Sequence, residues 1–213
     1  MRLLHDSVQP GRSADERTCP PAADPLGQLI ERALAGERSA ERTLLITVGP
    51  GMLGVVRRVL GARSADLDDV CQEASLSFLA ALPSFRGECT VVQFASRIAL
   101  LTALGARRRS RRRMSHETLD EGEAAIDLAP TPAERVEAMR RRAAVRALLD
   151  ELPMPRAEAL GLHLALGYTV SETASMMGTP VDTVRSRVRR GLTDLRDRLL
   201  RRPKLRDLVG GKP

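Results

Sequence analysis

The sequence predicts an all-α fold, made of two small helical domains joined by a flexible linker. Apolar residues recur at three- and four-residue steps along most of the chain, as on one face of an amphipathic helix. No stretch alternates apolar and polar residues as a half-buried strand does. The helical periodicity stops in an acidic, proline-bearing segment, which predicts a linker at residues 114–135. We therefore expect, in order, the following segments: a tail at 1–23, a domain at 24–113, the linker, a domain at 136–201 and a tail at 202–213.

The first half of the N-terminal domain is expected to contain two helices. Asp24 followed by Pro25 is typical of a helix start, with a capping side chain and a proline at the first helical position. A second helix is predicted from about Ser39 to Leu60. Gly49-Pro50-Gly51 lies inside it and predicts a kink or a break, because proline removes a helical hydrogen bond. Gly61 is expected to end the helix.

The second half of this domain is expected to contain two more helices. Asp66 is predicted to cap the third helix, and Pro83 ends it. The fourth runs from about Val91 to Arg113 and finishes in six arginines interrupted by one serine. Neighbouring like charges repel, so this run should be poorly helical without an anion. The favoured interpretation is a track for nucleic-acid phosphates, and the alternative is a solvated basic linker.

The C-terminal domain is expected to open with a helix ended by Pro153, followed by a helix around Leu160 and Leu164. A helix-turn-helix comes next. Thr169 and Glu172 have the spacing of a capping box, in which each side chain bonds the other residue's backbone N–H.

The second helix of this motif has its own start signals. Gly178 suits the left-handed end of the first helix, while Thr179 and Pro180 are expected to cap and begin the second. One face of the second helix carries an apolar stripe: Val181, Val184, Val188, Leu192, Leu195 and Leu199. The other face is rich in arginine, which predicts a helix that enters the DNA major groove. The candidate DNA contacts are Thr183, Arg185, Ser186, Arg187, Arg189 and Arg190. The alternative is an ordinary helical hairpin with a solvated basic face.

Composition agrees with a polyanionic partner and gives no sign of catalysis. The formal net charge is +7, and arginine supplies almost all of the positive charge, since Lys204 and Lys212 are the only lysines. The three cysteines share no metal-ligand spacing with the three histidines, so we expect reduced thiols, no metal, no cofactor and no enzyme activity. Neither a membrane-spanning run nor a signal peptide is recognisable, which favours the cytoplasm.

Two groups of motifs together resemble one protein family. Residues 66–73, Asp-Leu-Asp-Asp-Val-Cys-Gln-Glu, are followed by Leu-Pro-Ser-Phe-Arg-Gly at 82–87. Residues 180–187, Pro-Val-Asp-Thr-Val-Arg-Ser-Arg, come after Leu152-Pro153 in the second domain. In this order the motifs resemble a bacterial RNA polymerase sigma factor of the extracytoplasmic-function group. The resemblance covers roughly residues 25–201.

The resemblance implies a division of labour between the domains. The first domain would dock on a coiled coil in the largest subunit of core RNA polymerase and open the downstream (−10) promoter element. The second would read the upstream (−35) element as duplex, through the arginine-rich face named above. An anti-sigma inhibitor is a further possible partner. Polymerase docking falls on Asp66, Asp68, Asp69, Gln72 and Glu73. Contacts to the downstream element or its phosphates fall on Phe94, Arg97, Arg107, Arg108, Arg109, Arg111, Arg112 and Arg113.

One stretch departs from the family pattern. Relatives carry polar residues on the fourth helix where this chain has Leu100, Leu101 and Gly105. This departure leaves a degenerate sigma-like protein that does not melt DNA as one alternative. A free-standing helix-turn-helix regulator is the other, and co-purification with core polymerase would separate it from a sigma factor.

Overall fold

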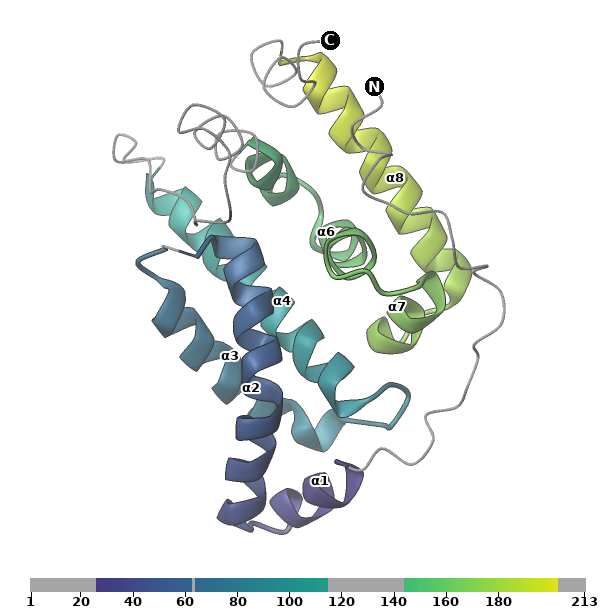
Figure 1. Ribbon diagram of the computed structural model, residues 1–213. Coiled ribbons are helices and arrows are strands. Elements are labelled where there is room, and N and C mark those ends of the chain that lie inside the picture. The colour runs from purple at the N-terminus through teal and green to yellow at the C-terminus, as the bar shows by residue number, and fades with distance from the viewer. Residues whose placement is uncertain (1–25, 63, 115–143, 203–213) are drawn as a thin grey trace, which may run out of the picture.

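The computed structural model describes residues 26–62, 64–114 and 144–202. The described residues form helices and turns and contain no strand, which confirms the all-α prediction (Figure 1). The predicted tail at 1–23, the Asp24-Pro25 helix start, nearly all of the 114–135 linker and the C-terminal tail from 203 onward lie outside the described residues.

The N-terminal domain is a bundle in which α2 (Arg38–Leu60) packs against α1 (Gly27–Leu34), α3 (Leu67–Ala81) and α4 (Val91–Met114). Of the kink or break predicted at Pro50, the break does not occur, because α2 continues from Arg38 to Leu60, and the kink stays a prediction. Pro50 and Ile46 are both exposed. Water can therefore reach the Ile46 carbonyl, which has lost its helical partner, and this lowers the cost of the proline.

The helix α2 is also the only one in the described part of the chain that is long and apolar enough to cross a membrane. The sequence prediction of no spanning segment did not anticipate this. One such helix is weak evidence, because a core helix of a helical bundle has the same length and composition. Here α2 contacts three other helices and buries one stripe, made of Ala40, Leu44, Val48, Met52, Val55 and Val56.

The C-terminal domain contains a helical segment at 144–150, α6 (Met154–Leu160), α7 (Val170–Met177) and α8 (Val181–Leu200). A single π-helical turn, η2 (Gly161–Ala165), follows α6 directly. In the N-terminal domain α3 ends at Ala81, two residues before the predicted stop at Pro83, and Pro83 lies inside a 3₁₀ turn, η1 (Leu82–Ser84), that follows it.

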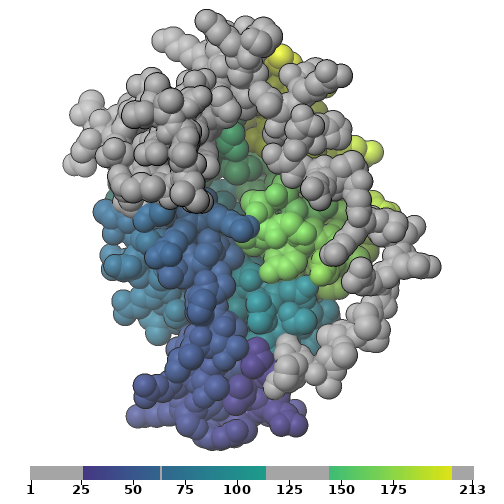
Figure 2. All heavy atoms as spheres, in the orientation of Figure 1, coloured from purple at the N-terminus to yellow at the C-terminus, as the bar shows by residue number. Residues whose placement is uncertain are grey.

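The two domains pack against each other, which the sequence did not predict. Figure 1 shows α4 running between the other N-terminal helices and the C-terminal domain, and α4 contacts both α7 and η2. One buried apolar cluster spans the two domains, from Leu44 and Phe78 on one side to Leu160 and Met176 on the other. In Figure 2 the green atoms of the C-terminal domain adjoin the blue and teal atoms of the N-terminal domain.

Candidate nucleic-acid interface

The start of α7 is a complete capping box, as predicted. The backbone N–H of Glu172 donates to Thr169 Oγ1 at 3.1 Å, and the backbone N–H of Thr169 donates to Glu172 Oε2 at 2.8 Å. Gly178 ends α7 in the left-handed conformation, with φ +59° and ψ +40°. Two backbone donors and the turn are thus fixed by local chemistry, and they set the direction in which α8 leaves the turn.

The predicted cap of α8 is wrong. Pro180 occupies the N-cap position, and no side chain there accepts a hydrogen bond from the helix. The hydroxyl of Thr179 is instead buried without a hydrogen-bond partner among the described residues. The fixed φ of Pro180 and the favourable charge of Asp182 in the first turn remain as start signals for α8.

The predicted apolar stripe of α8 is nearly correct. Val184 is fully buried, but Leu192 is 42% exposed and does not belong to the core. The buried residue at that level is Gly191, where an added Cβ would lie 2.8 Å from Leu160 Cδ1. Glycine therefore lets α8 approach α6 closely, and this close contact turns Leu192 outward.

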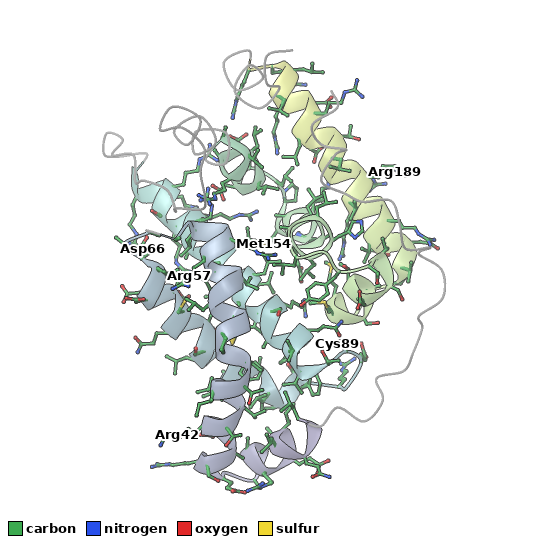
Figure 3. All side chains as sticks on the ribbon, in the orientation of Figure 1. Arg42, Arg57, Asp66, Cys89, Met154 and Arg189 are labelled. Atoms are coloured by element: carbon green, nitrogen blue, oxygen red, sulfur yellow. The ribbon has the colours of Figure 1, made fainter. Side chains whose placement is uncertain are left out.

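The opposite face of α8 presents cations to solvent. Arg185, Arg189 and Arg190 are exposed, and Figure 3 shows Arg189 on the outside of the molecule. Arg185 donates to Asp182 at 3.2 Å in an exposed pair that a phosphate or a base edge can replace at little cost. The remaining predicted contacts are half-buried: Thr183, Ser186 and Arg187.

The predicted docking face on α3 is exposed and acidic. All five of its predicted contacts are exposed, and Asp66 lies on the far side of the molecule from Arg189 in Figure 3. Asp66 occupies the N-cap position of α3 but accepts no capping hydrogen bond, so its predicted role as a cap is wrong. Glu73 differs from its neighbours, because it binds Arg109 on α4 at 2.7 Å.

Phe94, a predicted contact for the downstream element, is buried in the N-terminal core. Its ring centroid is 5.1 Å from that of Phe85 and 6.2 Å from that of Phe78, with tilted planes. Such tilted aromatic pairs stabilise a core, and this packing holds the Ser84–Gly87 loop against the start of α4. A contact between Phe94 and DNA stays a prediction.

The arginine run is helical, contrary to the prediction that it needs an added anion. Carboxylates of the protein pair with part of the run instead. Arg107 forms two hydrogen bonds to Asp150, at 2.7 and 3.0 Å, and Arg111 binds Glu151 at 2.8 Å. Arg108 donates to the Leu152 carbonyl at 2.6 Å. Arg112 and Arg113, at the end of the run, are exposed.

Glu151 lies within ion-pair distance of three arginines. Besides Arg111 it binds Arg202 at 2.8 Å and lies 3.6 Å from Arg198. Burial alone would raise the pKa of Glu151, but hydrogen bonds from Arg202 and Arg111 outweigh burial and hold the pKa below its usual value. Glu151 is therefore a carboxylate at neutral pH and a fixed negative charge beside α4.

Sequence reasoning missed these acidic partners. Asp150, Glu151 and Glu158 lie in or beside apolar helical stretches, where they resemble ordinary surface residues of a helix. Their pairing with α4 spans 40 or more positions along the chain, so no local pattern reports it. The one sequence signal for these acidic partners was the surplus of arginine in α4, because neighbouring positive charges on a helix repel one another unless anions lie beside them.

No metal site is apparent in the part of the chain that the structure describes. It contains no group of three or more histidine, cysteine or carboxylate side chains that could hold an ion. Cys71 and Cys89 are free thiols. Cys19, His5 and His116 lie outside the described residues.

The helix-turn-helix and the exposed arginines of α8 define a helical DNA-binding protein with a second helical domain. Comparison with known families matches residues 45–113 to sigma-70 region 2 and residues 142–195 to sigma-70 region 4. The ECF RNA polymerase sigma factor SigD of Mycobacterium tuberculosis is 31% identical over 184 residues, 82% of this chain and 84% of SigD. The chain belongs to the extracytoplasmic-function (ECF) group of sigma-70 RNA polymerase sigma factors.

A second relative agrees with this assignment. The ECF RNA polymerase sigma-E factor of Escherichia coli K12 is 30% identical over 167 residues, 75% of this chain and 86% of the relative. A solved structure of CnrH in complex with the cytosolic domain of CnrY is 22% identical, covers 82% of this chain and 97% of its own, and has a TM-score of 0.48. The protein is thus a sigma factor that directs RNA polymerase to promoters, and the alternative of a free-standing regulator is set aside.

Proposed function

We propose that this sigma factor divides its work between two exposed faces of opposite charge. The observation that carries the proposal is that the acidic face of α3 and the arginine face of α8 are both open to solvent. An acidic face suits a basic docking site on core polymerase. Arginines at the start of a helix-turn-helix recognition helix suit guanine O6 and N7 in the major groove.

The docking assignment rests on the α3 surface around Asp69. Asp66, Asp68 and Asp69 lie within one turn of the helix start, where their charge also stabilises the positive end of α3. That local benefit explains acids at a helix start but does not explain the exposed Gln72 and Glu73 further along. The favoured partner is the coiled coil of the largest polymerase subunit.

The upstream element is assigned to α8, and Arg185 and Arg189 are its central candidates. They are four positions apart, so they lie one above the other on one face of the helix. Both are exposed, and α8 is anchored from behind by Val184. A rigid backing lets an arginine hold the planar geometry that bidentate base contacts need.

The downstream element is assigned to α4 and to the loop that precedes it. The arginines of α4 supply the phosphate contacts, and the protein acts in the cytoplasm, where promoters and polymerase meet. We assign the chain no chemical reaction of its own. Its effect on transcription comes from binding and from the placement of the two domains on DNA.

A charge reversal tests the docking assignment. Asp69 is exposed and forms none of the ion pairs found among the described residues, whereas Glu73 holds Arg109 and would disturb α4 if changed. We expect Asp69→Lys to weaken binding to core polymerase about tenfold, which corresponds to about 1.4 kcal/mol. The matched control is Glu31→Lys, which reverses an exposed charge on α1.

The measurement is titration of labelled protein with core polymerase, with affinity for duplex carrying the upstream element measured in parallel. The control should bind core polymerase within about twofold of wild type, and neither variant should lose duplex affinity. Equal core affinity for Asp69→Lys and Glu31→Lys would sink the docking assignment.

A further inference from the structure

One ion pair joins the acidic face of α3 to the arginine run of α4. Nη2 of Arg109 donates to both carboxylate oxygens of Glu73, at 2.7 Å and 2.9 Å. The side chains of Arg109 and Glu73 are 49% and 46% exposed, so the pair lies at the surface, where α3 packs against α4. Both residues belong to the N-terminal domain, and the pair is therefore separate from the contacts between the two domains.

A glycine on α4 leaves the space in which the Arg109 side chain lies. Gly105 is one helical turn before Arg109, and helical side chains lean toward the preceding turn. A Cβ built on Gly105 would lie 3.5 Å from Nη1 of Arg109. The guanidinium thus rests over the backbone of Gly105, in space that a larger side chain would fill. Gly105 is one of the positions where this chain departs from the family pattern.

Glu73 has two competing partners of the same charge. The proposed function assigns Glu73 to a basic site on core polymerase, on the face that also carries Asp69. Asp69 forms none of the ion pairs found among the described residues, so a polymerase cation can approach it without displacing another cation. At Glu73 the same cation must displace Arg109 to reach both oxygens. Because the pair is exposed, this displacement costs little, but it still lowers the affinity of the face.

Arg109 also has two competing partners. It lies on one side of α4 with Arg112 and Arg113, which are three and four positions further along and are exposed. The proposed function assigns these arginines to the phosphates of nucleic acid. A guanidinium binds a carboxylate and a phosphate through the same geometry. A phosphate therefore competes with Glu73 for Nη2 of Arg109.

We propose that Glu73 and Arg109 exchange partners when core polymerase docks, so that Arg109 tunes the polymerase affinity of the α3 face. A polymerase cation replaces Arg109 on Glu73, and the released Arg109 can bind a phosphate. Each event favours the other, because the coupling between two binding sites is reciprocal. Arg109 is thus a positioning residue for docking, which acts through Glu73. This inference rests on the proposed function, because it takes from it the roles of both faces.

The first test removes the pair and keeps both charges. Gly105→Leu fills the space that the Arg109 guanidinium occupies. An exposed ion pair leaves about 15–40% of the carboxylate free, and the apparent affinity scales with this fraction. Gly105→Leu should therefore bind core polymerase about two- to sixfold more tightly than wild type, in a titration of labelled full-length protein. The matched control is Gly105→Ala, which should stay within about 1.5-fold of wild type because its Cβ makes an ordinary van der Waals contact.

The second test removes Arg109 itself. Arg109→Gln should tighten core binding in the same way, and its control is Arg42→Gln, at an exposed position on α2 that Figure 3 shows well away from Asp66. The two variants should differ in their affinity for a labelled single-stranded oligonucleotide. Gly105→Leu releases Arg109 and should bind the oligonucleotide more tightly, whereas Arg109→Gln loses a cation and should bind it more weakly. A merely structural effect on α4 would not give opposite signs.

The expected result is tighter core binding in both variants than in their controls, with opposite shifts in oligonucleotide affinity. If Arg109→Gln binds core polymerase no more tightly than Arg42→Gln, the exchange of partners is overturned. This comparison also decides the question if Gly105→Leu does not fold. Oligonucleotide shifts of the same sign in both variants would overturn the exchange as well. Failure of the proposed function would appear separately, as unchanged core binding in Asp69→Lys.

Discussion

The capping box of α7 allows a quantitative prediction for Thr169→Ala. The Thr169 hydroxyl accepts the Glu172 N–H at 3.1 Å and donates to the Glu172 carboxylate at 2.8 Å. Loss of a threonine N-cap costs about 1 kcal/mol, within a range of about 0.5–2 kcal/mol. Thr169 is exposed, so water replaces part of the loss and the middle of this range is expected. With a urea dependence of about 2 kcal/mol per molar, the unfolding midpoint should fall by about 0.5 M.

Thr179→Ala is the matched comparison, because both threonines precede helices of the same motif. Its hydroxyl is buried without a partner, so the substitution removes an uncompensated polar group. We expect a change within about 0.5 kcal/mol of wild type, or a slight gain in stability. The assay is urea unfolding followed by helical circular dichroism. Equal losses for the two variants, or a larger loss for Thr179→Ala, would refute the reasoning from capping geometry.

Three further predictions concern single side chains. Arg185→Ala or Arg189→Ala should reduce discrimination at one base pair of the upstream element by about 1–3 kcal/mol. Competition with single-base variants of the duplex measures this discrimination. Uniform weakening on all sequences would contradict base reading. The hydrogen bond from Arg32 is the main reason that the pKa of Glu37 is lowered to about 2. Arg32→Gln should therefore raise the pKa of Glu37 in an NMR titration, and an unchanged pKa would contradict this cause. Burial raises the pKa of Cys71, so its alkylation at neutral pH should be slower in the native protein than in urea, and equal rates would refute this.

Features that depend on near neighbours in the chain could be predicted from the sequence. The helices α2 and α4 begin and end close to their predicted bounds, because apolar periodicity and glycine at 61 are local signals. The capping box of Thr169 and the left-handed backbone of Gly178 could be predicted in the same way, because both are local signals. Such signals involve residues at most four positions apart, and the backbone satisfies them within one turn of helix.

The sequence predictions that were wrong share a different cause. Thr179 has the residue type of a cap, but the turn after Gly178 directs its hydroxyl inward, and only the tertiary packing of the motif decides this. Pro50 is tolerated because its side of α2 faces solvent, which depends on how the bundle is assembled. Leu192 follows the helical spacing, yet close packing at Gly191 turns it outward. In each case a long-range contact overrides a correct local preference.

The arginine run at 107–113 had two interpretations, a track for phosphates and a solvated basic linker, and composition alone could not separate them. A guanidinium binds a carboxylate and a phosphate through the same planar, two-point geometry, so a surplus of arginine indicates anions without saying whose they are. In this chain the bidentate pair of Arg107 with Asp150 answers that question within the protein. The same pairs set the difficulty of any switch to DNA, because each phosphate must displace a carboxylate rather than water. A phosphate can therefore bind Arg107, Arg109 or Arg111 only by displacing a carboxylate, whereas the exposed Arg112 and Arg113 are open to a phosphate directly.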